Sequence, residues 1–226
     1  MTKFDHAFVW TGGALFVASL AGCTWWYLVP LGRLQPDGGW PPIAWDAALV
    51  TVFALHHSLF AREAIKRRLA AIPARLRRSV YVWIASLLLI LVCALWRSVG
   101  GQLYDAAGAA AVAGAIAQLS GVLLIARAVA RIDPLELAGI RPSRQADALQ
   151  VDGPYRWVRH PLYLGWILAV FGAAHMTGDR LAFAVLTSIY LVVAVPLEER
   201  SLRQSFGDEY ARYERAVRWR IIPYIY

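Results

Sequence analysis

The chain has 226 residues, of which 59% are hydrophobic and 17% are charged, and its formal net charge is +8. A soluble domain carries about 25% charged residues, so this composition argues against a soluble globular protein. The basic residues lie between long apolar runs, so we expect them to face anionic lipid rather than nucleic acid. The chain is therefore predicted to be an all-α, polytopic membrane helical bundle of about five or six transmembrane helices.

Six apolar segments follow one another along the chain, at residues 7–29, 43–61, 79–96, 108–126, 162–178 and 181–197. The first ends in an aromatic belt at residues 25–27, and the fourth is rich in Ala and Gly, which favours close helix packing. The last two are short for a span of about 20 residues. We therefore expect them to form either a tight helical hairpin or a partly re-entrant pair.

The basic residues are distributed unequally between the connecting segments. They concentrate between the second and third apolar segments, between the fourth and fifth, and after the sixth, whereas the opposite side keeps Arg33, Arg97 and Arg180. An even number of spans with both termini in the cytoplasm satisfies this asymmetry. We expect an integral protein of a bacterial inner membrane whose polar segments, 127–161 and 198–226, lie on the cytoplasmic side.

The densest group of chemically capable residues covers positions 152–165. Pro161 suits the first position of a helix, because a proline there loses no hydrogen bond. His160 would then lie beside the free N–H groups at the positive end of the helix, with Tyr163 on the same face. With Arg159 next to it, such a helix start is a good cradle for a carboxylate or phosphate. Taken singly, each residue is more typical of an interfacial anchor.

Two adjacent carboxylates, Glu198 and Glu199, follow the last apolar segment. One interpretation is a solvated helix face on which Glu199 pairs with Arg203 four residues later. The alternative is that one of these glutamates meets an amino group or the hydroxyls of a ribose.

These two regions together resemble the C-terminal signature of the isoprenylcysteine carboxyl methyltransferase superfamily, which includes the phospholipid N-methyltransferases. The matching residues are Gly153-Pro154-Tyr155, Arg159-His160-Pro161, Tyr163 and Gly165, then Glu198-Glu199, Leu202, Phe206-Gly207, Tyr210, Tyr213 and Pro223. The two motifs occur in the family's order around a short hairpin.

The N-terminal half resembles the branch of this superfamily that contains the methanethiol S-methyltransferases and the NnrU-like proteins. The resemblance rests on residues 56–62, Arg78-Ser79, Tyr81-Val82 and residues 132–141. The sequence departs from the branch pattern at His56, where Gln is common, and at Arg77, where Glu is common. These departures bear on the substrate more than on the cofactor.

The resemblance implies methyl transfer from S-adenosylmethionine, which would bind at the cytoplasmic end of the last helices. We expect one membrane domain over residues 1–226, with an N-terminal four-helix part (1–126) and a cofactor-binding part (127–226). The expected cofactor-binding residues are Gly153, Tyr155, Arg159, His160, Tyr163, Gly165, Glu198, Glu199, Tyr210 and Tyr213. No metal site is expected.

Each part of the cofactor has a candidate partner in this set. Arg159 and His160 would hold its carboxylate, and Glu198 or Glu199 would take the ammonium group or the ribose. The tyrosines would wall the adenine and the sulfonium cation.

The expected catalytic residues are His57, Arg131, Arg218 and Glu199. A cation beside a thiol favours the thiolate form. Arg131, Arg218 or a histidine would supply that positive charge. His57 lies inside an apolar segment, where an ionisable residue is a functional candidate by default, although a histidine hydrogen-bonded within the bundle is an equal alternative. His175 is expected near the far face, in a structural role.

The favoured function is S-methylation of a small or lipophilic thiol such as methanethiol, with membrane lipid as the surrounding partner. A phospholipid amine or a prenylcysteine carboxylate is the alternative acceptor. A reading from another class is a non-catalytic, NnrU-like membrane protein that holds haem through His56, His57 or His160.

Overall fold

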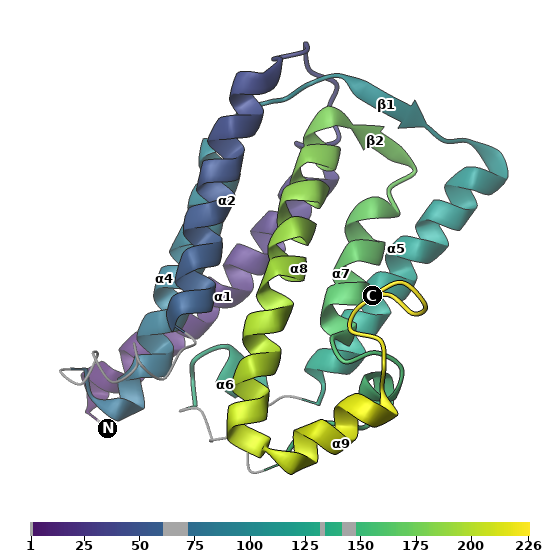
Figure 1. Cartoon of the computed structure of the whole chain (residues 1–226). Coiled ribbons are helices and arrows are strands. Elements are labelled where there is room, and N and C mark those ends of the chain that lie inside the picture. The colour runs from purple at the N-terminus through teal and green to yellow at the C-terminus, as the bar shows by residue number, and fades with distance from the viewer. Residues whose placement is uncertain (1, 61–71, 132–133, 142–147) are drawn as a thin grey trace. The chain divides into compact units, whose positions relative to one another are not determined.

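The computed structural model describes residues 2–60, 72–131, 134–141 and 148–226 (Figure 1). The basic residues expected at 62–68, and positions 132, 133 and 144, lie outside the described residues. The chain divides into two compact units, the first made of residues 1–101 with 133–145 and the second of 102–132 with 146–226. The predicted division after residue 126 stays a prediction.

The first unit contains the helices α1 (Lys3–Leu28), α2 (Trp40–Phe60), α4 (Ala74–Leu95) and α6 (Pro134–Leu137). Helix α4 packs against both α1 and α2. Thr2 and Asp5 form a capping box at the start of α1, and Arg75 joins it through a 3.0 Å contact from Nη2 to Oδ2 of Asp5. The buried carboxylate of Asp46 accepts a hydrogen bond from the backbone N–H of Arg97. Polar contacts therefore fasten the helix ends of this unit, while apolar side chains fill its centre.

The second unit contains β1 (Gln102–Asp105), α5 (Gly108–Val129), η1 (Gly153–Arg156), α7 (Pro161–Phe171), β2 (His175–Thr177), α8 (Gly178–Phe206) and α9 (Asp208–Ala216). Strands β1 and β2 pair antiparallel, with Asp105 opposite His175. Because β1 precedes α5 and β2 follows α7, this pairing closes one end of the α5–α7 hairpin (Figure 1). These two strands were not predicted from the sequence. His175 lies in β2, and its expected structural role near the far face stays a prediction.

Four of the described helices are long and apolar enough to cross a membrane, namely α1, residues 75–95 of α4, α5 and α8. These helices confirm the predicted all-α, polytopic membrane fold, whereas the predicted number of five or six spans stays a prediction. Helix α7 has only 11 residues, which is about 16 Å of helix against a hydrocarbon core of about 30 Å. The fifth predicted segment is therefore a half-length helix that continues into β2. The sixth is the 29-residue helix α8, which extends well beyond its predicted end.

Glycines allow α5 and α7 to approach each other closely. A Cβ atom at Gly121 would lie 2.5 Å from the carbonyl oxygen of Gly165, and one at Gly165 would lie 2.8 Å from that of Gly121. Both obstacles are backbone atoms, which do not move aside as a side chain would. The Ala- and Gly-rich composition of the fourth segment thus predicted its close packing correctly.

We expect Gly121→Ala to destabilise the protein by about 1–3 kcal/mol, because the new methyl group forces α5 and α7 apart. Gly22→Ala is the matched control, since a Cβ at Gly22 meets nothing within 4 Å. That change should be neutral or slightly stabilising, because alanine favours helix more than glycine does. Thermal unfolding of both variants in detergent, followed by circular dichroism, compares them. Equal melting temperatures would contradict the tight crossing.

Candidate active site

A buried carboxylate, that of Glu199 in α8, lies at the centre of the candidate site and is inaccessible to solvent. Its Oε1 atom accepts a 2.7 Å hydrogen bond from Nε of Arg159. Its Oε2 atom lies 3.2 Å from Nε of Arg220 and 3.5 Å from Nη2 of Arg203. A buried carboxylate requires such partners, because removing an ion from water costs several kcal/mol. Arg203 lies near Glu199 as the solvated-face interpretation expected, but that interpretation is wrong about solvation, because the carboxylate is buried and Arg159 is its nearer partner.

Arg159 also holds the segment that follows α9. Its Nη1 atom donates to the carbonyl oxygens of Val217 and Arg218 at 2.8 and 3.0 Å. The backbone N–H groups of Arg159 and His160 donate to the carbonyls of Trp219 and Arg220. Three stretches of chain thus meet at one ion pair: the end of α8, the start of α7 and residues 217–220.

Beside this ion pair, Glu198 carries an accessible carboxylate whose side chain is 43% exposed. The hydroxyl of Tyr163 donates to it, and Nδ1 of His160 lies 3.5 Å from its Oε2 atom. The rings of His160 and Tyr163 stack, with centroids 5.3 Å apart and planes 14° apart. Adjacent helix residues point in different directions, so one carboxylate faces the interior and the other faces a wall of aromatic rings.

The electrostatics of this group follow from burial and from the two glutamates. Burial lowers the pKa of His160, but hydrogen bonds and charge from Glu198 and Glu199 outweigh it, and the net pKa is raised. The pKa of the Tyr155 phenol is raised by burial and then by the charge of Glu198. Tyr155 therefore belongs to the same group, which presents negative charge, phenols and an imidazole.

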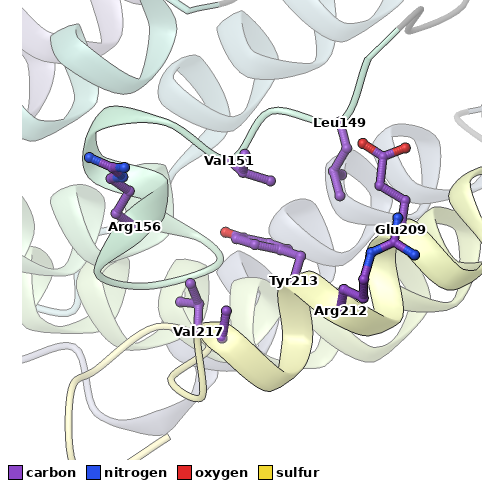
Figure 2. Close-up of a pocket in the computed structure, with 8 residues that line it drawn as sticks. Leu149, Val151, Arg156, Glu209, Arg212, Tyr213 and Val217 are labelled. Carbon is purple, nitrogen blue, oxygen red and sulfur yellow. The ribbon is translucent and has the colours of Figure 1, made fainter.

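A pocket of about 470 Å³ opens between the loop at residues 149–156 and α9 (Figure 2). Its lining combines apolar side chains with charged ones: Leu149, Val151, Arg156, Glu209, Arg212, Tyr213, Ala216 and Val217. The hydroxyl of Tyr213 donates to the backbone carbonyl of Tyr155 at 2.8 Å, which connects the pocket to the group around Glu198.

The neighbouring Tyr210 packs edge-on against Tyr213, with ring centroids 5.9 Å apart. Burial raises the pKa of both phenols, so both keep their protons at neutral pH. Among the described residues, the Tyr210 hydroxyl is fully buried and has no protein hydrogen-bond partner. An uncompensated buried hydroxyl is costly, and it is a feature that a bound polar molecule would relieve.

Two other predicted site residues have packing roles. Gly153 adopts a φ of +63°, and a Cβ there would lie 3.3 Å from Nη2 of Arg131, so the exposed Arg131 lies across this glycine. Gly165 faces α5 at the helix crossing described above.

Two further expected catalytic residues are exposed, in addition to Arg131. Arg218 is exposed and contributes its backbone carbonyl to Arg159. His57, in the first unit, is exposed and its Nδ1 lies 2.7 Å from the Tyr81 hydroxyl. Its catalytic role stays a prediction.

Arg220, Glu209 and Arg212 were missed by the sequence analysis as site residues. They belong to a stretch rich in charges, and no sequence spacing distinguishes an arginine that pairs with the buried Glu199 from an ordinary surface arginine.

We expect Glu199→Gln to destabilise the protein by about 3–5 kcal/mol, because it leaves the buried guanidinium of Arg159 without its counter-charge. Glu214→Gln is the control, since Glu214 also pairs with an arginine, Arg203, but at a more exposed position. Losing such a pair costs at most about 1 kcal/mol. Denaturant titration in mixed micelles measures both changes. If Glu199→Gln lowered the free energy of unfolding as little as the control does, the ion pair would not organise the site.

The raised pKa of His160 predicts a pH-dependent stability. The folded pKa lies above the unfolded one, about 6.5, so protonated His160 stabilises fully below about pH 6.5. This contribution is lost as the pH rises through the folded pKa. The melting temperature of the ligand-free protein should therefore fall more steeply with rising pH than that of the His160→Gln variant. If the melting temperatures of the two proteins changed equally with pH, coupling of His160 to the glutamates would be excluded.

Comparisons with known proteins identify the family of the chain. Residues 109–209 match the family described as phospholipid methyltransferase. The methanethiol S-methyltransferase of Pseudomonas deceptionensis is 31% identical over 195 residues, covering 80% of this chain and 74% of the relative. Methanethiol S-methyltransferase 2 of Bradyrhizobium diazoefficiens is 35% identical over 178 residues, covering 75% and 69%.

A more distant similarity is to Nurim of Sus scrofa, which is 28% identical over 190 residues, covering 76% of this chain and 72% of the relative. No solved structure matches the chain. The two methanethiol S-methyltransferases match this chain at more than 30% identity over about three quarters of its length, and four of its described helices are long enough to span a membrane. The chain therefore belongs to the family of the methanethiol S-methyltransferases, within the isoprenylcysteine and phospholipid methyltransferase superfamily, and is a membrane methyltransferase.

Proposed function

We propose that the protein transfers a methyl group from S-adenosylmethionine to a small or lipophilic thiol, with methanethiol as the first candidate. Relatives named methanethiol S-methyltransferase support this acceptor. The observation that carries the donor is the accessible carboxylate of Glu198 beside the stacked rings of His160 and Tyr163. A carboxylate next to aromatic faces suits a molecule with an ammonium and a sulfonium cation.

The residues around the pocket fit the remaining parts of such a donor. Tyr213 and its apolar neighbours offer a surface for adenine, and Glu209 offers acceptors for ribose hydroxyls. Arg159 uses its hydrogen bonds on Glu199 and on two backbone carbonyls. We therefore assign the donor's carboxylate to Arg156 or Arg212 at the pocket and give Arg159 and Glu199 positioning roles.

The chemistry asks little of the protein beyond geometry. When bound, S-adenosylmethionine supplies an electrophilic methyl group on a sulfonium sulfur. The protein must align the acceptor sulfur with that group and exclude water. A free cysteine thiol has a pKa of about 8.5, and a cation beside a bound thiol raises its thiolate fraction. Arg131 and Arg218, both in the second unit, are the proposed sources of that charge.

A phospholipid amine is the second candidate acceptor, because residues 109–209 match the phospholipid methyltransferase family. A prenylcysteine carboxylate is a third. Incubation of purified protein with labelled donor and each acceptor class separates them, since the products are a volatile sulfide, a methylated lipid and a methyl ester.

The site end of the second unit is proposed to face the cytoplasm of a bacterium, with the protein in the inner membrane and both termini inside. Near the ends of α5 and α8, this side carries Arg127, Arg131, Arg200 and Arg203, whereas Arg180 lies at the opposite end of α8. Basic residues prefer the cytoplasmic side of a membrane.

Glu198→Gln should weaken binding of S-adenosylmethionine at least tenfold while the protein still folds, because it removes the accessible negative charge. A tenfold loss corresponds to about 1.4 kcal/mol. Isothermal titration calorimetry in detergent measures the affinity of wild type and variant. Asp208→Asn removes an equal charge from an exposed position on α9 and should leave the affinity unchanged. Tight binding that is insensitive to Glu198→Gln would move the cation site elsewhere, and a folded wild type that binds no donor would remove the proposed function.

A further inference from the structure

The segment after α9 turns back toward the membrane-embedded part of its unit. In Figure 1 residues 217–226 form the yellow loop that leaves α9 and returns beside the start of α7. The carbonyls of Trp219 and Arg220 accept hydrogen bonds from the N–H groups of Arg159 and His160, at 2.9 and 2.8 Å. Because Pro161 begins the apolar helix α7 immediately afterwards, this loop is fixed at the level where apolar chain begins.

The loop has a defined shape. The carbonyl of Tyr226 accepts hydrogen bonds from the N–H groups of Arg220, Ile221 and Ile222, at 2.9, 2.8 and 3.1 Å. Tyr224 adopts a φ of 66°, which is unfavourable for a residue with a side chain and persists only where the surroundings impose it. The ring of Tyr224 lies 5.2 Å from that of Trp219. These backbone contacts therefore fix the positions of Tyr224 and Ile225.

These two side chains face outward. Tyr224 is 86% exposed and Ile225 is 77% exposed, and Trp157, two residues before Arg159, is 67% exposed. Arg215 is exposed immediately before the loop. Aromatic rings with arginines beside them are the composition of a protein surface at the headgroup level of a membrane, where rings sit among headgroups and arginines meet lipid phosphates.

We propose that Trp157, Tyr224 and Ile225, named here the tail patch, insert into the cytoplasmic membrane interface, with Arg215 on anionic phospholipid headgroups. The patch then keeps residues 217–226 against the membrane. Because Arg220 and two backbone carbonyls of the same segment contact Glu199 and Arg159, lipid contact and site geometry share one rigid loop. This proposal is independent of the identity of the methyl acceptor.

A polarity-sensitive nitrobenzoxadiazole label at position 225 tests the proposal. Ile225→Cys is made in full-length protein carrying Cys23→Ala and Cys93→Ala, and the labelled protein is placed in nanodiscs of phosphatidylcholine and phosphatidylglycerol. Asp208→Cys, exposed at the start of α9, is the control. Should Ile225→Cys fail to fold, Tyr224→Cys carries the label.

Headgroup-level spin-labelled lipid should quench the label at 225 at least twofold more than the label at 208, and aqueous iodide should show the reverse order. Replacing phosphatidylglycerol by phosphatidylcholine should reduce the lipid quenching at 225. Equal iodide quenching at both positions would place the loop in water and overturn the proposal. Protection of position 225 from both quenchers would mean that protein covers it, whether this chain or a second copy, and would overturn it as well.

Discussion

The ion pair between Glu199 and Arg159 is the interaction on which the rest of the candidate site depends. Either charge alone, buried at this depth, would cost several kcal/mol, and together they are tolerated because each also has further partners. Those partners lie on α8, before α7 and after α9, so satisfying two charges fixes three remote stretches of sequence. The aromatic wall and the pocket are built on that fixed frame.

The adjacent glutamates divide two tasks that are difficult for one residue. A carboxylate surrounded by arginines is rigid but electrostatically saturated, so it has little left to offer a ligand. Glu198, one position earlier, is half-exposed and contacts the Tyr163 phenol and the His160 imidazole, so part of its carboxylate stays accessible to a ligand. Methyl transfer depends on precise alignment of the donor and acceptor, so this division is useful. The accessible carboxylate of Glu198 is held in position because the adjacent Glu199 is fixed by its ion pairs.

Much of this architecture could be predicted from the sequence because apolar runs of span length have few alternatives. The motif residues 159–163 and 198–199 also met as expected. The role of Arg220 was not predictable, since its pairing depends on a chain reversal after α9. Nor were β1 and β2, because strands of three and four residues carry little periodicity. Helix α7 was predicted too long because the apolar composition continues through Ala173 and Ala174 after the helix has ended.

The half-length of α7 has a consequence for biogenesis. An apolar helix of 11 residues is too short to leave the translocon for lipid on its own. Its strand continuation also has backbone groups that lipid cannot satisfy until β1 pairs with them. Segments α7 and α8 must therefore partition as a unit against an already inserted α5. The order of synthesis supplies this, because β1 and α5 emerge from the ribosome first.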